Sequence, residues 1–168
     1  FAFDPARLPA PFAPAQGEDA IARLAEAGFA AAGEARALLL SAFGNSPYLR
    51  RLALREPAVL ARLFAEGPDG LAAEFCAEAL SAGDAAEEGA AMRALRAAKA
   101  KTALVAAFSD IAGVWPLLRV TRALTCFADA ALKGALRFAL KAAAADTELA
   151  GKSGAELEES TGMVFLAM

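Results

Sequence analysis

The residues of this chain that offer chemistry are carboxylates and cations, because the sequence contains no histidine. That absence removes Ser-His and Cys-His nucleophilic systems and every histidine-ligated metal site. Asp110 is the carboxylate of most interest, since its neighbours in Ala-Ala-Phe-Ser-Asp-Ile-Ala-Gly are of types that are usually buried. A buried carboxylate needs a cation or several hydrogen-bond donors. Two interpretations stay open: a contact to substrate, metal or another domain, or a structural ion pair with a nearby Arg or Lys or a bond to the turn at Gly113.

Basic side chains recur along a long helix that we predict over residues 116–145. Such a row could bind phosphate or an acidic partner. The solvated side of an amphipathic helix produces the same pattern, so the structural interpretation stays open beside the functional one. The candidate residues on this basic face are Arg119, Arg122, Lys133, Arg137 and Lys141.

The cysteine pattern does not predict a site. Cys76 and Cys126 do not have zinc-ligand spacing, and a structural disulfide is not expected in a reducing compartment. Helical arithmetic places Cys126 on a polar, exposed face, and we expect Cys76 to be buried.

Composition favours an all-α protein without a membrane span. Apolar residues make up 58% of the 168 residues, and alanine, the best helix former, is frequent among them. The longest apolar stretch, 102–118, is interrupted by Asp110, Gly113 and Pro116 and falls short of the roughly 20 residues that a bilayer helix needs. Residues 1–14 lack the pattern of a signal peptide. We therefore expect a cytoplasmic protein that does not bind membrane. The mixed charges and the net charge of −3 predict no nucleic-acid-binding surface.

Start and stop signals divide the chain into helices. The prolines within residues 1–16 predict an extended arm, and residues 17–145 a multi-helix bundle. We expect a loop over 146–160, followed by residues 161–168 with one terminal strand. The predicted helices cover 18–29, 34–43, 46–55, 56–66, 70–80, 85–111 and 116–145, the last two being the long ones.

The helix over 116–145 carries the clearest amphipathic pattern. Spacing at 100° per residue collects one apolar stripe, which we expect to face the core. The basic residues above, with Asp129, lie opposite. The stripe consists of Leu117, Val120, Leu124, Phe127, Ala128, Ala131, Leu132, Ala135, Phe138 and Ala139.

Three segments in order carry a resemblance to a known family. The first spans residues 43–57 and contains GNSPYL; the second joins 93–99 to 104–113; the third is the helix segment 120–132. Together they resemble the N-terminal half of the bifunctional glutamine synthetase adenylyltransferase/adenylyl-removing enzymes. The final run, 162–168, is similar to the strand that leads into that family's GMGKLGxxELNYSSDIDL signature, which these residues do not contain.

The resemblance implies a role within a larger, multifunctional enzyme of nitrogen metabolism. In that family the N-terminal half removes AMP from glutamine synthetase by phosphorolysis, giving ADP, and the C-terminal half attaches AMP from ATP. It implies Mg²⁺ and ATP/ADP as cofactors of the parent enzyme and none in this segment. The implied partners are glutamine synthetase, PII signalling protein and the remaining nucleotidyltransferase domains in cis. No catalytic or metal-binding residue is carried over, because the signature that holds them lies outside these residues; a stand-alone helical interaction or regulatory module is the alternative.

Overall fold

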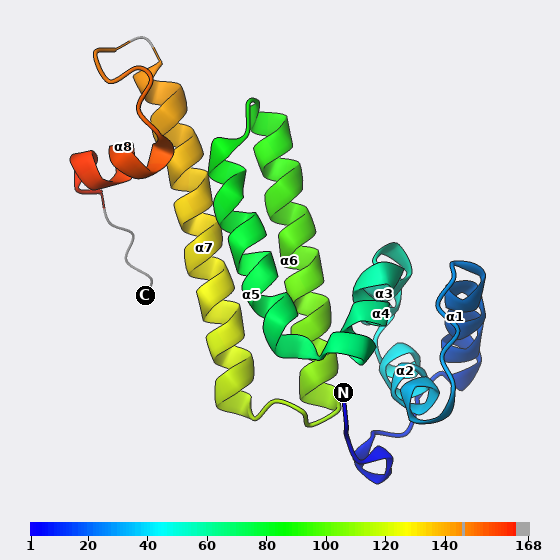
Figure 1. The fold of residues 1–168 in the computed structure, drawn as a ribbon. Helices are drawn as coiled ribbons and strands as arrows, with labels where there is room; N and C mark the ends of the chain where they lie inside the picture. The colour runs from blue at the N-terminus through cyan, green and yellow to red at the C-terminus, as the bar shows by residue number, and fades with distance from the viewer. Residues whose placement is uncertain (146, 164–168) are drawn as a thin grey trace. The chain divides into compact units, whose positions relative to one another are not determined.

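The computed structural model describes residues 1–145 and 147–163. Within them the regular structure is helical and includes no strand, which confirms the all-α prediction (Figure 1). Short 3-10 helices cover Pro5–Arg7 and Ala82–Asp84. The α-helices are α1 (Pro14–Glu26), α2 (Gly33–Asn45), α3 (Pro47–Arg55), α4 (Pro57–Glu66), α5 (Pro68–Ser81), α6 (Glu88–Ile111), α7 (Leu117–Ala144) and α8 (Gly154–Thr161).

Helix starts follow the predicted chemistry. The hydroxyl of Ser46 accepts a hydrogen bond from the Leu49 N–H at 3.2 Å and caps α3. Proline occupies the first turn of α1, α3 and α4, where its missing N–H leaves no intrahelical bond unmade. As a result α3 and α4 end where predicted and begin one residue after Ser46 and Glu56, which are their N-cap residues.

The lead-in over residues 1–16 is less extended than predicted. Asp4 caps a 3-10 turn by accepting from the Ala6 N–H at 3.0 Å. Helix α1 already begins at Pro14, because a proline fits the first turn of a helix as well as an extended arm. Proline count alone therefore overestimates the length of the arm.

The end of α2 holds this lead-in in place. The Asn45 side chain accepts from the Phe12 N–H at 3.1 Å and donates to the Ala10 carbonyl at 2.9 Å. A Cβ on Gly44 would lie 2.5 Å from the Pro11 Cβ, so the close approach requires glycine. Gly44 and Asn45 of the GNSPYL segment thus hold the arm, and Ser46 starts the next helix.

One compact unit comprises Phe1–Ala72 and Ala100–Leu124. Its helices α1 and α2 approach closely at Gly17, where a Cβ would lie 2.9 Å from Leu40 Cδ1. The rings of Phe43 and Phe108 meet edge to face with centroids 6.2 Å apart. The most buried side chains of this core include Leu24, Leu38, Leu39, Phe43, Leu60, Leu63, Leu104 and Phe108.

A second compact unit comprises Ala73–Lys99 and the chain from Thr125 on. Here α5 and α7 approach backbone to backbone, since a Cβ on Gly134 would lie 2.2 Å from the Ala79 carbonyl oxygen. Gly83, in the 3-10 turn after α5, also lies close to α7: a Cβ placed on it would be 2.8 Å from the Arg137 Cβ. Glycine at these contacts sets which side of α7 is buried in this unit.

The buried side of α7 differs from the predicted stripe. Leu117, Leu124 and Leu132 are 71%, 44% and 42% exposed, and the alanines at 128, 135 and 139 are exposed as well. Because helical arithmetic weighs apolar side chains, it could not register Gly134 as the point of closest approach. The residues of α7 that are buried are Val120, Ala123, Gly134, Leu136 and Ala144.

The predicted loop over 146–160 instead contains most of α8. The sequence signal for this helix is Ser153 followed three residues later by Glu156, the pattern of a capping box. The predicted terminal strand falls on residues 164–168, outside the described residues; Met163 has no regular structure. None of the described helices is both long and apolar enough to cross a membrane.

Candidate functional site

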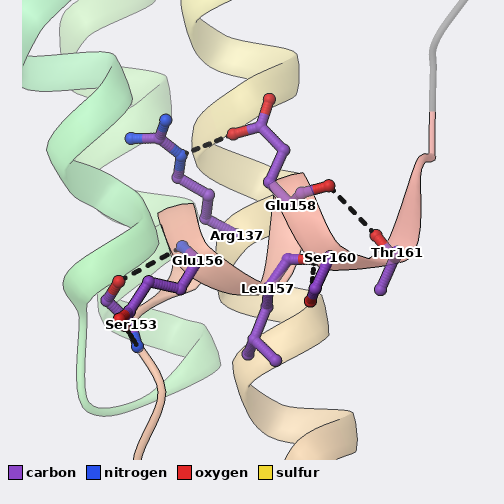
Figure 2. Close-up of polar contacts among 7 residues, drawn as sticks. All are labelled: Arg137, Ser153, Glu156, Leu157, Glu158, Ser160 and Thr161. Atoms are coloured by element: carbon purple, nitrogen blue, oxygen red, sulfur yellow. Dashed lines mark hydrogen bonds and ion pairs between the residues drawn. The ribbon is translucent and has the colours of Figure 1, made fainter.

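Arg137, a predicted site residue, anchors α8 to α7 (Figure 2). Its Nε donates to Glu158 Oε2 at 2.8 Å, and the two side chains are only 26% and 19% exposed. A Cβ on Gly154 would lie 2.7 Å from the Arg137 Cβ, so the start of α8 rests directly on this arginine. Leu157, 2% exposed, supplies the apolar contact of α8. We call Arg137, Gly154, Leu157 and Glu158 the α8 clasp.

The N-terminus of α8 is stabilised by its own capping box. Glu156 accepts from the Ser153 N–H at 2.7 Å, and the Ser153 hydroxyl accepts from the Glu156 N–H at 3.2 Å (Figure 2). The pKa of the Glu156 carboxyl is lowered, chiefly by the hydrogen bond from the Ser153 backbone and, to a smaller extent, by the Ser153 side chain. The charged form of Glu156 is therefore the form that fits α8.

Lys141, one helical turn beyond Arg137, borders a shallow apolar pocket. Its Nζ donates to the Asp84 carbonyl at 3.3 Å. The pocket encloses about 330 Å³ and is lined by Ala85, Ala86, Phe138, Lys141, Ala142, Ala145, Ala150 and Gly151. Because the lining besides Lys141 consists of Phe138, alanines and a glycine, the surface suits a hydrocarbon side chain better than a phosphate.

Arg119 makes structural contacts in the first unit. Its Nη2 and Nε donate to Asp69 Oδ1 at 2.6 and 3.1 Å. The guanidinium carbon lies 5.0 Å from the centroid of the Trp115 ring, a cation–π geometry. These contacts join the start of α7 to the start of α5.

The other basic candidates, Arg122 and Lys133, are exposed on α7. Arg119, Arg137 and Lys141 each contact a different group, so the described contacts are those of a structural polar face. A phosphate or acidic ligand for the predicted basic face as a whole stays a prediction.

The expectation that Asp110 is buried is wrong. Ser109 is fully buried and Ala112 is 9% exposed, but Asp110 lies on the exposed side of the last turn of α6. A change of one position turns a helical side chain by about 100°, so a carboxylate among apolar neighbours can still reach water. Its carbonyl accepts from the Gly113 N–H at 2.9 Å and forms part of the turn. Asp110 thus does not need a cation to offset burial.

The cysteines differ in environment. Cys126 is exposed, as predicted, and Cys76 is partly rather than fully buried. Partial burial, and then the nearby Cys126, raises the pKa of the Cys76 thiol. In the part of the chain that the structure describes, no three His, Cys, Asp or Glu side chains are grouped so as to hold a metal ion.

Sequence reasoning missed the residues that position these groups. Glu158, the partner of Arg137, lay in the predicted loop, and only the Ser153–Glu156 spacing pointed to a helix there. Gly134 and Gly154 have no side chain that a pattern could score, and their role follows from close contacts.

Comparison with known proteins identifies relatives along most of the chain. Residues 36–168 match the model of the family described as glutamate-ammonia ligase adenylyltransferase. No solved structure is significantly similar.

Several similar proteins are named bifunctional glutamine synthetase adenylyltransferase/adenylyl-removing enzyme. The relative from Bradyrhizobium diazoefficiens is 40% identical over 155 residues, which cover 86% of this chain and 16% of that protein. The relative from Xanthobacter autotrophicus is 36% identical over 134 residues, 80% of this chain and 14% of that protein. One from Rhodopseudomonas palustris is 39% identical over 134 residues, with shares of 79% and 14%.

The chain therefore spans about one-sixth or less of the length of these relatives. The family match itself covers more than half of the chain, from the GNSPYL region through α8. The chain belongs to the glutamate-ammonia ligase adenylyltransferase family.

Proposed function

We propose that this chain is a helical segment of an enzyme that adenylylates and deadenylylates glutamine synthetase. In this proposal it is the scaffold of the adenylyl-removing half and is inactive alone. The observation that carries it is the family match over residues 36–168, together with relatives named for both activities.

The contacts of the basic candidates support a scaffold role. Arg119 is held by Asp69 and Trp115, and Arg137 by Glu158. A carboxylate pairs with each guanidinium charge, and such pairs stabilise contacts between helices. The described geometry of both residues is thus that of helix anchoring.

The chemistry would belong to the rest of the polypeptide. Binding of Mg²⁺ and ATP or ADP is assigned to the nucleotidyltransferase domains, where carboxylate-held metal supports phosphoryl-type transfer. Glutamine synthetase is the proposed substrate and PII the proposed regulator, both in the cytoplasm. The α8 clasp would fix the position from which the polypeptide leads on to the first of these domains.

The test is a deadenylylation assay with adenylylated glutamine synthetase, phosphate and Mg²⁺. The segment 1–168 is compared with the full-length polypeptide. We expect AMP removal with formation of ADP by the full-length polypeptide alone. Activity of the isolated segment would contradict the scaffold role, and inactivity of the full-length polypeptide would contradict the proposed reaction.

A stand-alone interaction or regulatory module is the second candidate. It is favoured by the exposed leucines at 117 and 118, which suit a partner surface. The reading frame distinguishes the two candidates: a stop codon directly after Met168 supports the module, whereas continuation into a Gly-rich turn with paired aspartates supports the enzyme.

A further inference from the structure

Three leucines are exposed at the corner between α6 and α7, within the first compact unit. Leu117 is 71%, Leu118 81% and Leu124 44% exposed. The adjacent Pro116 is exposed as well. We call Leu117, Leu118 and Leu124 the leucine corner.

The corner is built on ordered backbone. Gly113 turns the chain with φ +67°, and the N–H groups of Val114 and Trp115 donate to the Ser109 carbonyl at 2.9 and 3.1 Å. Trp115 is 5% exposed and lies beneath the Arg119 guanidinium, which Asp69 holds. The leucines are therefore presented by a fixed turn and a paired helix start.

The leucine corner can also be desolvated at low cost. Thr121 lies among the leucines on the first turns of α7, and its hydroxyl already donates within the helix, with the Leu117 and Leu118 carbonyls each 3.1 Å away. Covering the corner would therefore leave this hydroxyl satisfied, so it carries no penalty from an unpaired polar group there. Adjacent exposed leucines with this support are typical of an interaction surface.

We propose that the leucine corner is the surface on which an apolar face of the remaining polypeptide docks. This rests on the proposed function, in which the chain is part of a longer enzyme. The relatives match this segment with only 14–16% of their length, and the family match includes the corner. Polypeptide in cis is present at high effective concentration, whereas a second copy or glutamine synthetase must be recruited from solution.

The test measures thiol labelling in the full-length polypeptide. Leu118→Cys is labelled with a maleimide in folded and urea-unfolded protein, and the modified peptide is quantified by mass spectrometry. Glu26→Cys, at an exposed polar position of α1, is the matched control. We expect Leu118→Cys to be labelled at least roughly tenfold more slowly in the folded protein than in the unfolded protein. The control should be labelled at nearly the same rate in both. Leu117→Cys repeats the measurement should Leu118→Cys fail to fold.

Each other outcome overturns the proposal. Equal labelling of Leu118→Cys in folded and unfolded protein means that the corner stays open. Protection that disappears on dilution identifies a second copy as the occupant, and protection that appears only with added glutamine synthetase identifies a partner in trans. Deadenylylation is measured on the folded protein before labelling. An active enzyme with an open corner refutes the docking surface alone, and an inactive enzyme refutes the proposed function.

Discussion

Replacing Gly134 with alanine should destabilise the chain, although alanine is the better helix former. Gly134 lies inside α7, far from either end. In an open helix interior, the change from glycine to alanine stabilises by about 0.5–1 kcal/mol because the unfolded chain loses freedom. The sign at Gly134 is therefore a direct test of how closely α5 and α7 pack.

The close approach reverses that sign. A Cβ at position 134 would lie 2.2 Å from the Ala79 carbonyl oxygen, whereas Cβ atoms in proteins essentially never lie within 3.0 Å of a non-bonded heavy atom. The obstacle is backbone, so no rotamer change relieves it and the two helices must separate. Overpacking costs about 1–3 kcal/mol, and a backbone obstacle argues for the upper part of that range, about 2–3 kcal/mol, which leaves a net loss of about 1–2.5 kcal/mol after the gain of about 0.5–1 kcal/mol. The melting temperature should fall by about 2–10 °C.

Gly70→Ala is the matched control. Gly70 is exposed in α5, and nothing lies within 4 Å of a Cβ placed there. This variant should gain about 0.5–1 kcal/mol. Urea unfolding of both variants and the parent chain, followed by circular dichroism at a helical wavelength, measures the two changes. A Gly134→Ala chain as stable as the parent, beside a stabilised Gly70→Ala chain, would refute the close packing of α5 and α7.

Three further predictions concern α8 and the thiols. The pKa of the Glu156 carboxyl is lower in the folded chain than in the unfolded chain, so its contribution to the stability of α8 is present above the unfolded pKa and lost as the pH falls through the folded pKa. NMR titration of this carboxyl should show the lowered pKa, and Ser153→Ala should raise it. Leu157→Ala, at a side chain 2% exposed, should cost about 2–5 kcal/mol of α8 docking, seen as faster amide exchange confined to α8; unchanged exchange would contradict the clasp. Cys126 should react with a maleimide before Cys76, whose raised pKa and partial burial keep its thiol protonated and shielded; peptide mass spectrometry reads the order, and equal rates would contradict it.

Helix ends were predictable wherever the chain itself encodes them. Ser46 with Pro47, and Glu56 with Pro57, set the starts of α3 and α4 through local backbone chemistry. Such signals act over a few residues, so no tertiary contact is needed to interpret them. The same kind of signal, Ser153 with Glu156, marks the start of α8, but the loop prediction for 146–160 did not use it.

The candidate site was predictable in its residues but not in its pairing. The sequence identifies Arg119 and Arg137 as charges on one long helix. Their partners, Asp69 and Glu158, are distant in sequence and meet them only after folding. The exposure of Asp110 depends on which side of α6 faces solvent in its last turn, and composition does not determine that.

The error over α7 has a physical explanation that bears on the proposed docking surface. The sequence pattern weighs leucines and therefore selects the side of α7 that carries Leu117, Leu124 and Leu132. The structure buries mainly another side, and its closest contact with α5 is at Gly134, a residue without a side chain. A helix that packs against its neighbours through one side and also carries leucines on another has apolar surface in excess of what this chain covers. If the remaining polypeptide covers the leucine corner, Leu117 and Leu124 correspond to an interface within the longer enzyme, and the contact at Gly134, further along α7, corresponds to packing within this segment.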